Sequence, residues 1–204
     1  MARQMIYLAS RSPRRRELLK QVGITFEMML LREDNRRGAD IDENPQPGEK
    51  PDAYASRLAH AKAEVAAMYM GRRSLPARPV LAADTTVVCD NAIIGKPADR
   101  EEAGRILRRL SGRQHQVITA VALATPERIE QAMSVSTVWF RGLTDDEIRR
   151  YVATGEPLDK AGAYAIQGRA AAFATRIEGS FSGIMGLPLA ETSELLRRFG
   201  IETF

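Results

Sequence analysis

The chain has 204 residues with a net charge of +4, and 44% of its residues are hydrophobic and 27% charged. These values are typical of a soluble globular protein, either one domain or two small lobes, and no apolar run of about 18 residues could span a membrane. The amino terminus lacks the features of a signal peptide, and the single cysteine, Cys89, cannot form an internal disulfide. We therefore expect a cytoplasmic protein. Its excess of basic over acidic residues favours an anionic partner: a nucleic acid, a nucleotide or a phosphorylated metabolite.

The sequence predicts strands and helices that alternate along the chain. Apolar and β-branched runs predict strands at residues 5–9, 24–31, 79–90, 115–124 and 132–140. Start and stop signals predict helices at residues 13–22, 51–70, 99–110, 145–154 and 187–199, with a loop at 32–50 and loops and short strands at 156–186. On the helix at 51–70, the residues expected to face the core are Tyr54, Leu58, Ala61, Val65 and Met68. The order predicts the α/β class, with a mixed twisted sheet and flanking helices, in a single domain over residues 1–204.

The first helix begins with an unusual concentration of positive charge. Ser12 is the expected N-cap and Pro13 the first helical residue. Arg14, Arg15 and Arg16 follow at once, although the start of a helix carries partial positive charge and attracts anions instead. On the helical wheel, Arg15 lies about 15° from the centre of the buried stripe, Arg14 about 90° and Arg16 about 110°. We expect Arg14 and Arg15 to face a bound phosphate and Arg16 to face solvent; an ordinary solvated face is the alternative.

Asp84 interrupts an apolar strand, in the stretch LAADTTVV. A carboxylate in that setting must be hydrogen-bonded, ion-paired or bound to a metal. Open α/β sheets place their sites at the carboxyl ends of strands, so Asp84 is a candidate metal ligand or general base. A purely structural role is an equal alternative on this evidence.

Only five of the 30 basic residues are lysines, so each lysine is a candidate for a specific contact. Lys62 in the long helix, Lys96 in GKP and Lys160 in DKAG carry the compact charge that suits phosphate oxygens. Asp42 and Glu43, in the acidic stretch DIDE, are candidate metal ligands. Ordinary solvent exposure is the competing interpretation for each of these residues.

Several familiar site patterns are absent from the sequence. It has no G-x-x-x-x-G-K-[ST] phosphate loop, and GSFSGIMG does not match the G-x-S-x-G nucleophile elbow. His60 and His115 have neither metal-ligand spacing nor cysteine partners, so we expect them to be structural or exposed. Cys89 follows TTVV and is expected to be a small buried hydrophobic residue rather than a nucleophile.

Eight stretches of the sequence occur in a recognisable order: LASRSPRRRELL, DIDE, LAHAKA, AADTTVV, GKP, LSGRQHQVITAV, DKAGAYAIQG and GLPLAETSELL. In that order they resemble the Maf-like nucleotide pyrophosphatases, and the resemblance covers nearly all 204 residues. DKAGAYAIQG is similar to the dTTP/UTP pyrophosphatase branch rather than to the branch acting on 7-methyl-GTP. The resemblance implies hydrolysis of dTTP and UTP to the monophosphate and pyrophosphate, with a divalent metal ion, Mg²⁺ or Mn²⁺. It also implies an elongated, two-lobed Maf/ITPase-like fold around a central cleft, a homodimer, and a role in nucleotide-pool sanitation.

The family's functional positions can be carried over residue by residue. They correspond here to Ser10, Arg14, Arg15, Glu43, Lys62, Asp84, Thr85, Lys96 and Gln167. Asp84 and Lys96 are the catalytic residues that the resemblance implies, and Asp84 with Glu43 would bind the metal. Arg14, Thr85 and Gln167 correspond to the positions that set base preference. The sequence departs from the family at residues 31–40, where the loop before Asp42 is longer than expected, and at Arg11, where a small residue is more usual.

Two other functions remain open on the sequence. A nucleic-acid-binding module would use the arginines on phosphates, but only 6% of the residues are aromatic and no basic stripe interleaves with them. A regulatory role in cell division and septum formation could accompany the enzyme activity. Gln167 does not by itself decide the base, because a glutamine amide that pairs with uracil or thymine can flip to match cytosine.

Overall fold

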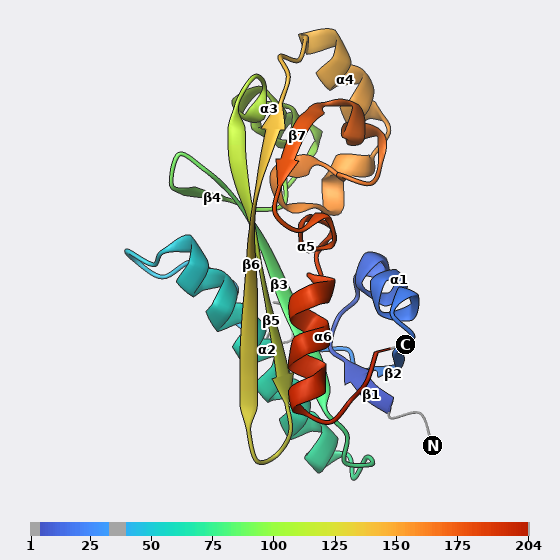
Figure 1. The fold of residues 1–204 in the computed structure, drawn as a ribbon. Coiled ribbons are helices and arrows are strands. Elements are labelled where there is room, and N and C mark those ends of the chain that lie inside the picture. Colours follow the sequence, from blue (N-terminus) through green and yellow to red (C-terminus); the bar gives the residue numbers. More distant parts are fainter. Residues whose placement is uncertain (1–4, 33–39, 204) are drawn as a thin grey trace. The chain divides into compact units, whose positions relative to one another are not determined.

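The structure is a computed structural model that describes residues 5–32 and 40–203. Its strands form a mixed sheet in the order β2-β1-β3-β5-β6-β7, with β4 paired to β3 (Figure 1). β1 runs parallel to β2 and β3, whereas β4 is antiparallel to β3 and β7 to β6. The strands are β1 (Met5–Leu8), β2 (Thr25–Met28), β3 (Val80–Cys89), β4 (Ala92–Ile94), β5 (Gln114–Ala124), β6 (Ile129–Phe140) and β7 (Ala174–Glu178). The predicted α/β class with a mixed sheet is confirmed.

The chain divides into two compact units, each built from segments that are far apart in the sequence. The first unit contains Met1–Asp84, Thr119–Met133 and Gly186–Phe204, and the second contains Thr85–Ile118 and Ser134–Met185. Strands β3, β5 and β6 each contribute residues to both units. The division therefore falls inside strands and not in a linker, and the single domain over residues 1–204 stays a prediction.

The helices of the first unit, among its described residues, are α1 (Pro13–Gln21), α2 (Pro51–Arg72) and α6 (Leu189–Arg198). Helix α1 begins as predicted, because Ser12 is its N-cap and accepts a hydrogen bond from the backbone N–H of Arg15. Figure 1 shows α2 beside the parts of β5 and β6 that belong to this unit. There the side-chain amide of Gln131 donates to the backbone carbonyl of Ser56 over 2.8 Å.

The core-facing side of α2 differs from the expected one. Of the five residues expected there, Leu58 alone is fully buried, and Met68 is 46% exposed. The buried side consists of Ala55, Leu58, Ala59, Ala63, Ala66 and Met70. Alanines let a helix approach its neighbours closely, so dense interior packing favours this face over the one with larger side chains. The correction matters for the site, because it puts Lys62 between Ala59 and Ala66 on the inward side of the helix.

The second unit holds helices α3 (Arg100–Leu110), α4 (Asp145–Ala153) and α5 (Phe181–Met185). Thr144 caps α4 as predicted, and Glu147 completes a capping box with it. Aromatic rings in edge-to-face contact form much of the core, with ring centroids 4.9–5.9 Å apart. They belong to His115, Phe140, Tyr151, Tyr164 and Phe173.

Some element boundaries differ from the predicted ones. β2 ends at Met28 instead of residue 31, opposite Leu8 at the end of its partner β1, and one more hydrogen bond follows, from the N–H of Met29 to the carbonyl of Leu8 over 3.0 Å. β6 begins earlier than expected, at Ile129. Helix α5 and three short 3₁₀ turns fall in the stretch expected to hold loops and short strands; the turns are Glu156–Asp159, Ala161–Ala163 and Arg169–Ala172. Over residues 5–32 and 40–203, no helix has the length and apolar character that a membrane crossing needs.

His115 is a buried neutral imidazole in the second unit. It is 2% exposed, and its Nε2 lies 2.9 Å from the hydroxyl oxygen of Tyr164. Burial lowers the pKa of His115 from 6.5 to about 4. Between those pH values residue 115 is protonated in the unfolded chain but not in the folded chain. As the pH falls through this range, the free energy of unfolding therefore decreases, by about 3 kcal/mol in total.

We expect the variant His115→Gln to have a flatter dependence of stability on pH than the wild type. Between pH 6.5 and pH 4.5 the wild type should lose about 2 kcal/mol more of its free energy of unfolding than the variant, because glutamine takes up no proton. Urea unfolding at several pH values measures both profiles. Parallel profiles of the wild type and the variant would show that His115 has the same pKa in the folded and the unfolded chain.

Candidate functional site

Arg15 fixes the start of α1 to two other parts of the first unit. Its Nε donates to the carbonyl oxygen of Gly186 over 2.7 Å, and its Nη1 donates to Oγ of Ser10 over 3.1 Å. Ser10 is only 9% exposed, and its Oγ also accepts from the backbone N–H of Ser12 over 3.2 Å. One guanidinium group therefore joins the end of β1 to a segment 171 positions later in the chain.

The three arginines of α1 differ in exposure as the helical wheel predicts. Arg14 and Arg15 are half-buried, whereas Arg16 is exposed. Burial lowers the pKa of Arg15; the charge of Asp84 opposes this shift, that of Arg14 adds to it, and that of Glu43 opposes it. The start of α1 thus places Arg15 within electrostatic range of two of the predicted acidic site residues, with Arg14 beside it.

Lys62 connects those two acids. Its Nζ lies 2.7 Å from Oδ1 of Asp84, in β3, and 2.6 Å from Oε1 of Glu43, in the loop before α2. The side chains of Lys62 and Asp84 are 17% and 13% exposed, and that of Glu43 is 49% exposed. Burial alone would lower the pKa of Lys62, but the two carboxylates outweigh it and the net shift is upward. The ammonium group therefore keeps its charge in a largely dry position because both acids contact it.

The loop that carries Glu43 is held by Arg57, which the sequence analysis did not single out, and by Tyr54, which was expected to face the core. Arg57, on α2, donates to both carboxylate oxygens of Glu49 over 2.6 and 2.8 Å. The same guanidinium group donates to the backbone carbonyls on either side of Glu43, over 3.2 and 3.1 Å. The hydroxyl of Tyr54 donates to the carbonyl of Glu43 itself over 2.9 Å. These contacts fix the backbone at residues 42–44.

The electrostatics of this loop follow from the same contacts. Hydrogen bonds from Arg57 lower the pKa of Glu49 to about 2. Burial raises the pKa of Tyr54 to about 12, and the charges of Asp84 and Glu43 add to the shift. A sequence signal existed: Tyr54 and Arg57 are three residues apart and share one side of the helix, with an acid just before the helix begins.

Three of the predicted site residues belong to the second unit. Thr85 follows Asp84 in β3 and is half-buried, whereas Lys96 and Gln167 are exposed. Within the part of the chain that the structure describes, neither Lys96 nor Gln167 has a hydrogen-bond or ion-pair partner. The backbone next to Lys96 is nevertheless fixed, because the N–H of Gly162 donates to the carbonyl of Gly95 over 3.1 Å.

A divalent metal ion fits the chemistry of Asp84 and Glu43. Mg²⁺ in phosphate sites uses one or two carboxylates and completes its coordination with water and substrate phosphate oxygens. Contact of both carboxylates with one ammonium group shows that they can share a cation. Among the described residues, no group of three or more His, Cys, Asp or Glu side chains is placed to hold a metal ion, so water and substrate oxygens would have to supply the other ligands.

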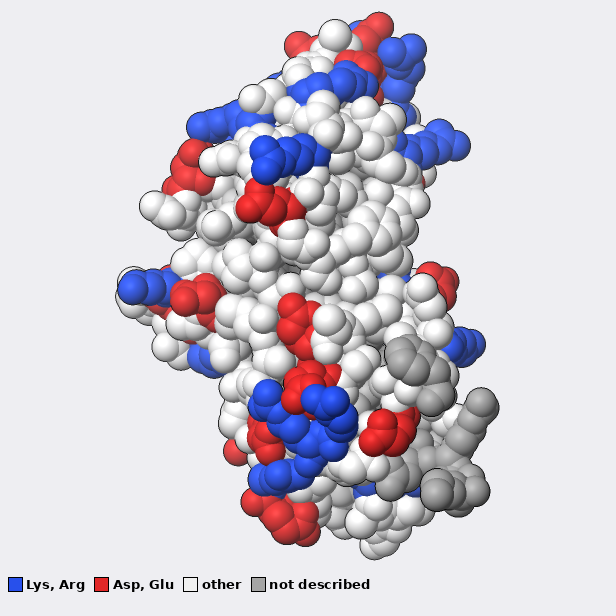
Figure 2. All heavy atoms as spheres, viewed as in Figure 1, with Lys and Arg blue, Asp and Glu red and all other residues white. Residues whose placement is uncertain are grey.

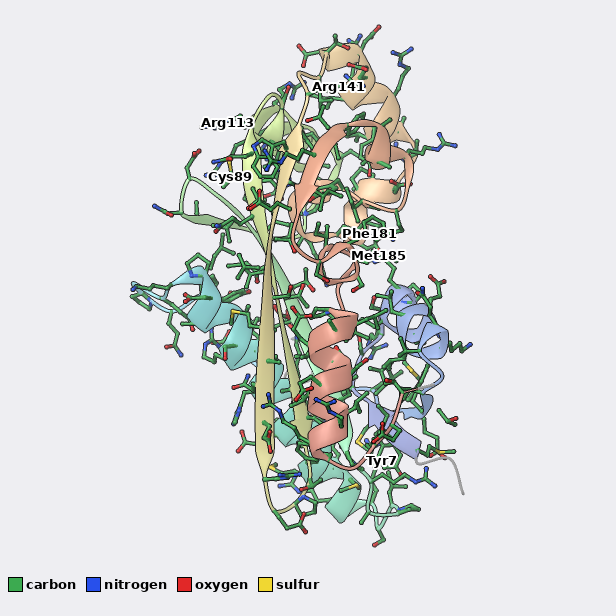
Figure 3. The ribbon with its side chains drawn as sticks, viewed as in Figure 1. Tyr7, Cys89, Arg113, Arg141, Phe181 and Met185 are labelled. Carbon is green, nitrogen blue, oxygen red and sulfur yellow. The ribbon has the colours of Figure 1, made fainter. Side chains whose placement is uncertain are left out.

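The remaining predicted residues have ordinary structural surroundings. Lys160 donates to the backbone carbonyl of Glu156 over 2.6 Å. Asp42 is exposed and accepts a hydrogen bond from the backbone of its own loop. Cys89, labelled in Figure 3, is 2% exposed at the end of β3, so its predicted burial is confirmed. Of the long loop at 31–40, residues 33–39 lie outside the described part of the chain.

The whole sequence can be compared with known families and proteins. Residues 5–199 match the model of the family described as Maf-like protein. The chain belongs to the Maf-like protein family. The match spans segments of both units of this Maf-like chain, so the family assignment covers all nine predicted site residues.

Relatives with curated names support the assignment over nearly the full length of the Maf-like chain. The dTTP/UTP pyrophosphatase of Aromatoleum aromaticum is 58% identical and covers 96% of this chain and 95% of its own. The proteins of the same name from Dechloromonas aromatica and Nitrosomonas europaea are 55% and 54% identical, covering 96% and 98% of this chain and 97% and 96% of their own. A solved structure, of the Staphylococcus aureus Ham1 protein, is 16% identical with a TM-score of 0.49 over 96% of this chain and 97% of that one.

Two neighbouring arginines of this Maf-like protein should differ in their effect on stability. Arg15→Ala removes the donor to the Gly186 carbonyl and one of the two donors to the buried Ser10 hydroxyl oxygen, so we expect the free energy of unfolding to fall by about 1–3 kcal/mol. Arg16→Ala removes an exposed cation from a helix start and should change the free energy of unfolding by less than about 0.5 kcal/mol. Urea unfolding of both variants measures the difference. Equal losses would show that the contacts of Arg15 contribute nothing specific.

Proposed function

We propose that this Maf-like protein is a nucleoside triphosphate pyrophosphatase that hydrolyses dTTP and UTP to the nucleoside monophosphate and pyrophosphate. The names of relatives at 54–58% identity support this activity. The observation that carries it is the contact of Lys62 with both Asp84 and Glu43, within electrostatic range of Arg15. Such a set combines acids that can accept a proton or bind a metal with cations that can neutralise phosphates. Nucleotide-pool sanitation is the cellular role that this activity suits.

The triphosphate is bound mainly by cationic side chains in this proposal. Arg14 and Arg15 add two guanidinium groups to the free backbone N–H groups of a helix start, and both features favour phosphate. The hydroxyl of Ser10 lies at the same helix start. Lys62 and Lys96 supply compact charges for phosphate oxygens. Since pyrophosphate leaves with added negative charge, neutralising that charge is expected to lower the barrier most.

Asp84 is the proposed proton acceptor. The oxygen of a water molecule forms a bond to the α-phosphorus, and the bond from that phosphorus to the oxygen bridging to the β-phosphate breaks. The proton of the water passes to Asp84, and pyrophosphate leaves with the electron pair of the broken bond. Lys62 donates to Oδ1 of Asp84 over 2.7 Å and thereby holds the carboxylate in one position. A fixed base is more effective than a mobile one, because the geometry of proton transfer is set in advance.

Asp84 and Glu43 are also the residues that would hold the divalent cation, Mg²⁺ or Mn²⁺. When bound, such an ion neutralises charge on the phosphate oxygens. Arg57 and Tyr54 support this role because they hold the backbone of Glu43 from three sides. Glu43 can therefore reach a cation beside Asp84 without first ordering its loop.

Base preference is assigned in this proposal to Arg14, Thr85 and Gln167, on the strength of the family resemblance. A glutamine amide can accept a hydrogen bond from N3–H and donate one to O4 of uracil or thymine. The exposed amide of Gln167 is open to such a partner. A homodimer in the cytoplasm is the expected state of the protein, again from the resemblance.

Binding of nucleic acid is less favoured than nucleotide hydrolysis. A nucleic-acid surface gathers several basic side chains along one track, which gives steeply salt-dependent binding. Figure 2 instead shows basic and acidic side chains interspersed on the face in view. A part in septum formation would depend on a partner and adds nothing to the chemistry of Asp84 and Lys62.

The proposed activity is tested by the release of pyrophosphate from a panel of nucleotides with Mg²⁺ or Mn²⁺. We expect dTTP and UTP to be hydrolysed faster than ATP and GTP, because a site that pairs with a pyrimidine edge leaves its polar groups unsatisfied with a purine. Faster hydrolysis of the purine nucleotides would refute the substrate assignment. Tight, salt-dependent binding of DNA or RNA with no pyrophosphate release would favour the alternative function.

Asp84→Asn should lower kcat for dTTP by at least about 100-fold, because asparagine cannot accept the proton. The variant keeps the size of the side chain and an oxygen that can accept from Lys62, so it should fold normally. Steady-state kinetics beside circular dichroism separate the two effects. Near-normal turnover of a folded variant would exclude Asp84 as the proton acceptor.

A further inference from the structure

Gln167 occupies the tip of a tight turn in the second unit. The N–H of Gly168 donates to the carbonyl of Ala165 over 3.0 Å and closes the turn. Ile166 anchors it with a side chain that is only 4% exposed, while Gln167 itself is exposed. Because no described residue holds the side chain of Gln167, its position depends on the backbone of the turn and on whatever fixes that backbone.

Two side chains outside the turn fix it on both sides. The hydroxyl oxygen of Tyr151 accepts from the N–H of Ala165 over 3.2 Å, and the hydroxyl donates to Oε1 of Glu156 over 2.7 Å. The other carboxylate oxygen, Oε2, accepts from the N–H of Arg169 over 3.3 Å. The pair therefore contacts the backbone two residues before and two residues after Gln167.

Tyr151 is itself held rigidly in the core of the second unit. It lies near the end of α4, is 4% exposed, and meets Phe173 edge to face with ring centroids 5.1 Å apart. Burial raises the pKa of Tyr151, and its hydrogen bond to Glu156 raises it further, so the hydroxyl stays protonated and able to donate. Lys160 holds the backbone of Glu156, through the hydrogen bond to its carbonyl.

The close approach of Glu156 to the turn also explains a glycine. A Cβ atom at residue 168 would lie 2.5 Å from Oε1 and 2.6 Å from Oε2 of Glu156. A flexible carboxylate could move aside, but this one is bonded to Tyr151 and to the backbone of Arg169. Gly168 therefore lets the carboxylate lie directly against the backbone of the turn.

We propose that Tyr151 and Glu156 are positioning residues for base selection, which fix the turn so that the Gln167 amide meets only the N3–H and O4 edge of uracil or thymine at the right distance. The inference rests on the proposed function and goes beyond it, because neither residue touches the substrate. A turn free to shift by about 1 Å could adapt its amide to other bases, since hydrogen-bond discrimination depends on position. Loosening the turn should therefore lower selectivity more than the rate of the chemical step.

The test compares kcat/KM for dTTP with kcat/KM for CTP and GTP in Tyr151→Phe, Glu156→Gln and Gly168→Ala. Tyr151→Phe keeps the ring packing, Glu156→Gln keeps the size of the side chain, and Gly168→Ala displaces the carboxylate without removing it. Each should lower the preference for dTTP over the other nucleotides at least about fivefold, as loss of a hydrogen bond does, while kcat for CTP stays within about threefold. Gln167→Ala should lower the same preference at least as much.

Glu147→Gln provides the matched control. Glu147 is a glutamate of the same unit whose carboxylate accepts from Arg141, labelled in Figure 3, over 2.7 Å and from the backbone of Thr144 over 2.9 Å. It has no contact with the turn among the described residues, so its variant should lower the melting temperature without changing nucleotide preference. Thermal unfolding of every variant shows how much stability each has lost.

The outcomes separate this inference from the function on which it rests. Unchanged preference in the three positioning variants, with lowered preference in Gln167→Ala, would overturn the inference and leave the pyrophosphatase activity standing. Lowered preference in Glu147→Gln would also overturn it, because selectivity would then follow overall stability. Unchanged preference in Gln167→Ala would exclude the turn as a base reader. Absence of hydrolysis by the wild type would overturn the proposed function and the inference together.

Discussion

The charge of one largely buried lysine organises the functional part of the first unit. Nζ of Lys62 directly contacts both Asp84 and Glu43, and it joins α2 to β3 and to the loop before α2. A buried ammonium group without acids would be costly, and the two neighbouring carboxylates without a cation would repel each other. Each of the three groups is stable in its position because of the other two. A substrate or metal that approaches this set therefore meets acids already held close together.

Both functional loops are held in the same way, although they belong to different units. Glu43 lies in a loop whose backbone is bonded to Arg57 and Tyr54, and Gln167 lies in a turn whose backbone is bonded to Tyr151 and Glu156. In each case a helix supplies an aromatic hydroxyl or a guanidinium group that reaches loop backbone. Functional side chains on loops need such support, because the loops have few packing contacts of their own.

Local signals made much of this structure predictable. The N-cap at Ser12, the cap at Thr144 and the exposure of Arg16 depend on neighbours within one or two turns of chain, which the sequence displays directly. The predicted buried face of α2 was wrong. Close packing against the neighbouring elements favours the face with alanines over the face with larger apolar residues, and the helix sequence alone does not show this. Arg57 and Glu156 were missed because the contacts that fix the loops are with backbone. The spacing of Tyr54 and Arg57 shows that they share one side of α2, but not which backbone carbonyls that side meets.

The division of β3, β5 and β6 between the two units has a consequence for synthesis on the ribosome. Every segment of the second unit lies between residues 85 and 185, so its chain is complete when Met185 has been made. The first unit must wait for residue 186 onward, because Gly186 receives the hydrogen bond of Arg15 and α6 belongs to that unit. The amino-terminal strand and helix, although translated first, are thus among the last to obtain all their partners, and the start of α1 is set only when the end of the fold has emerged.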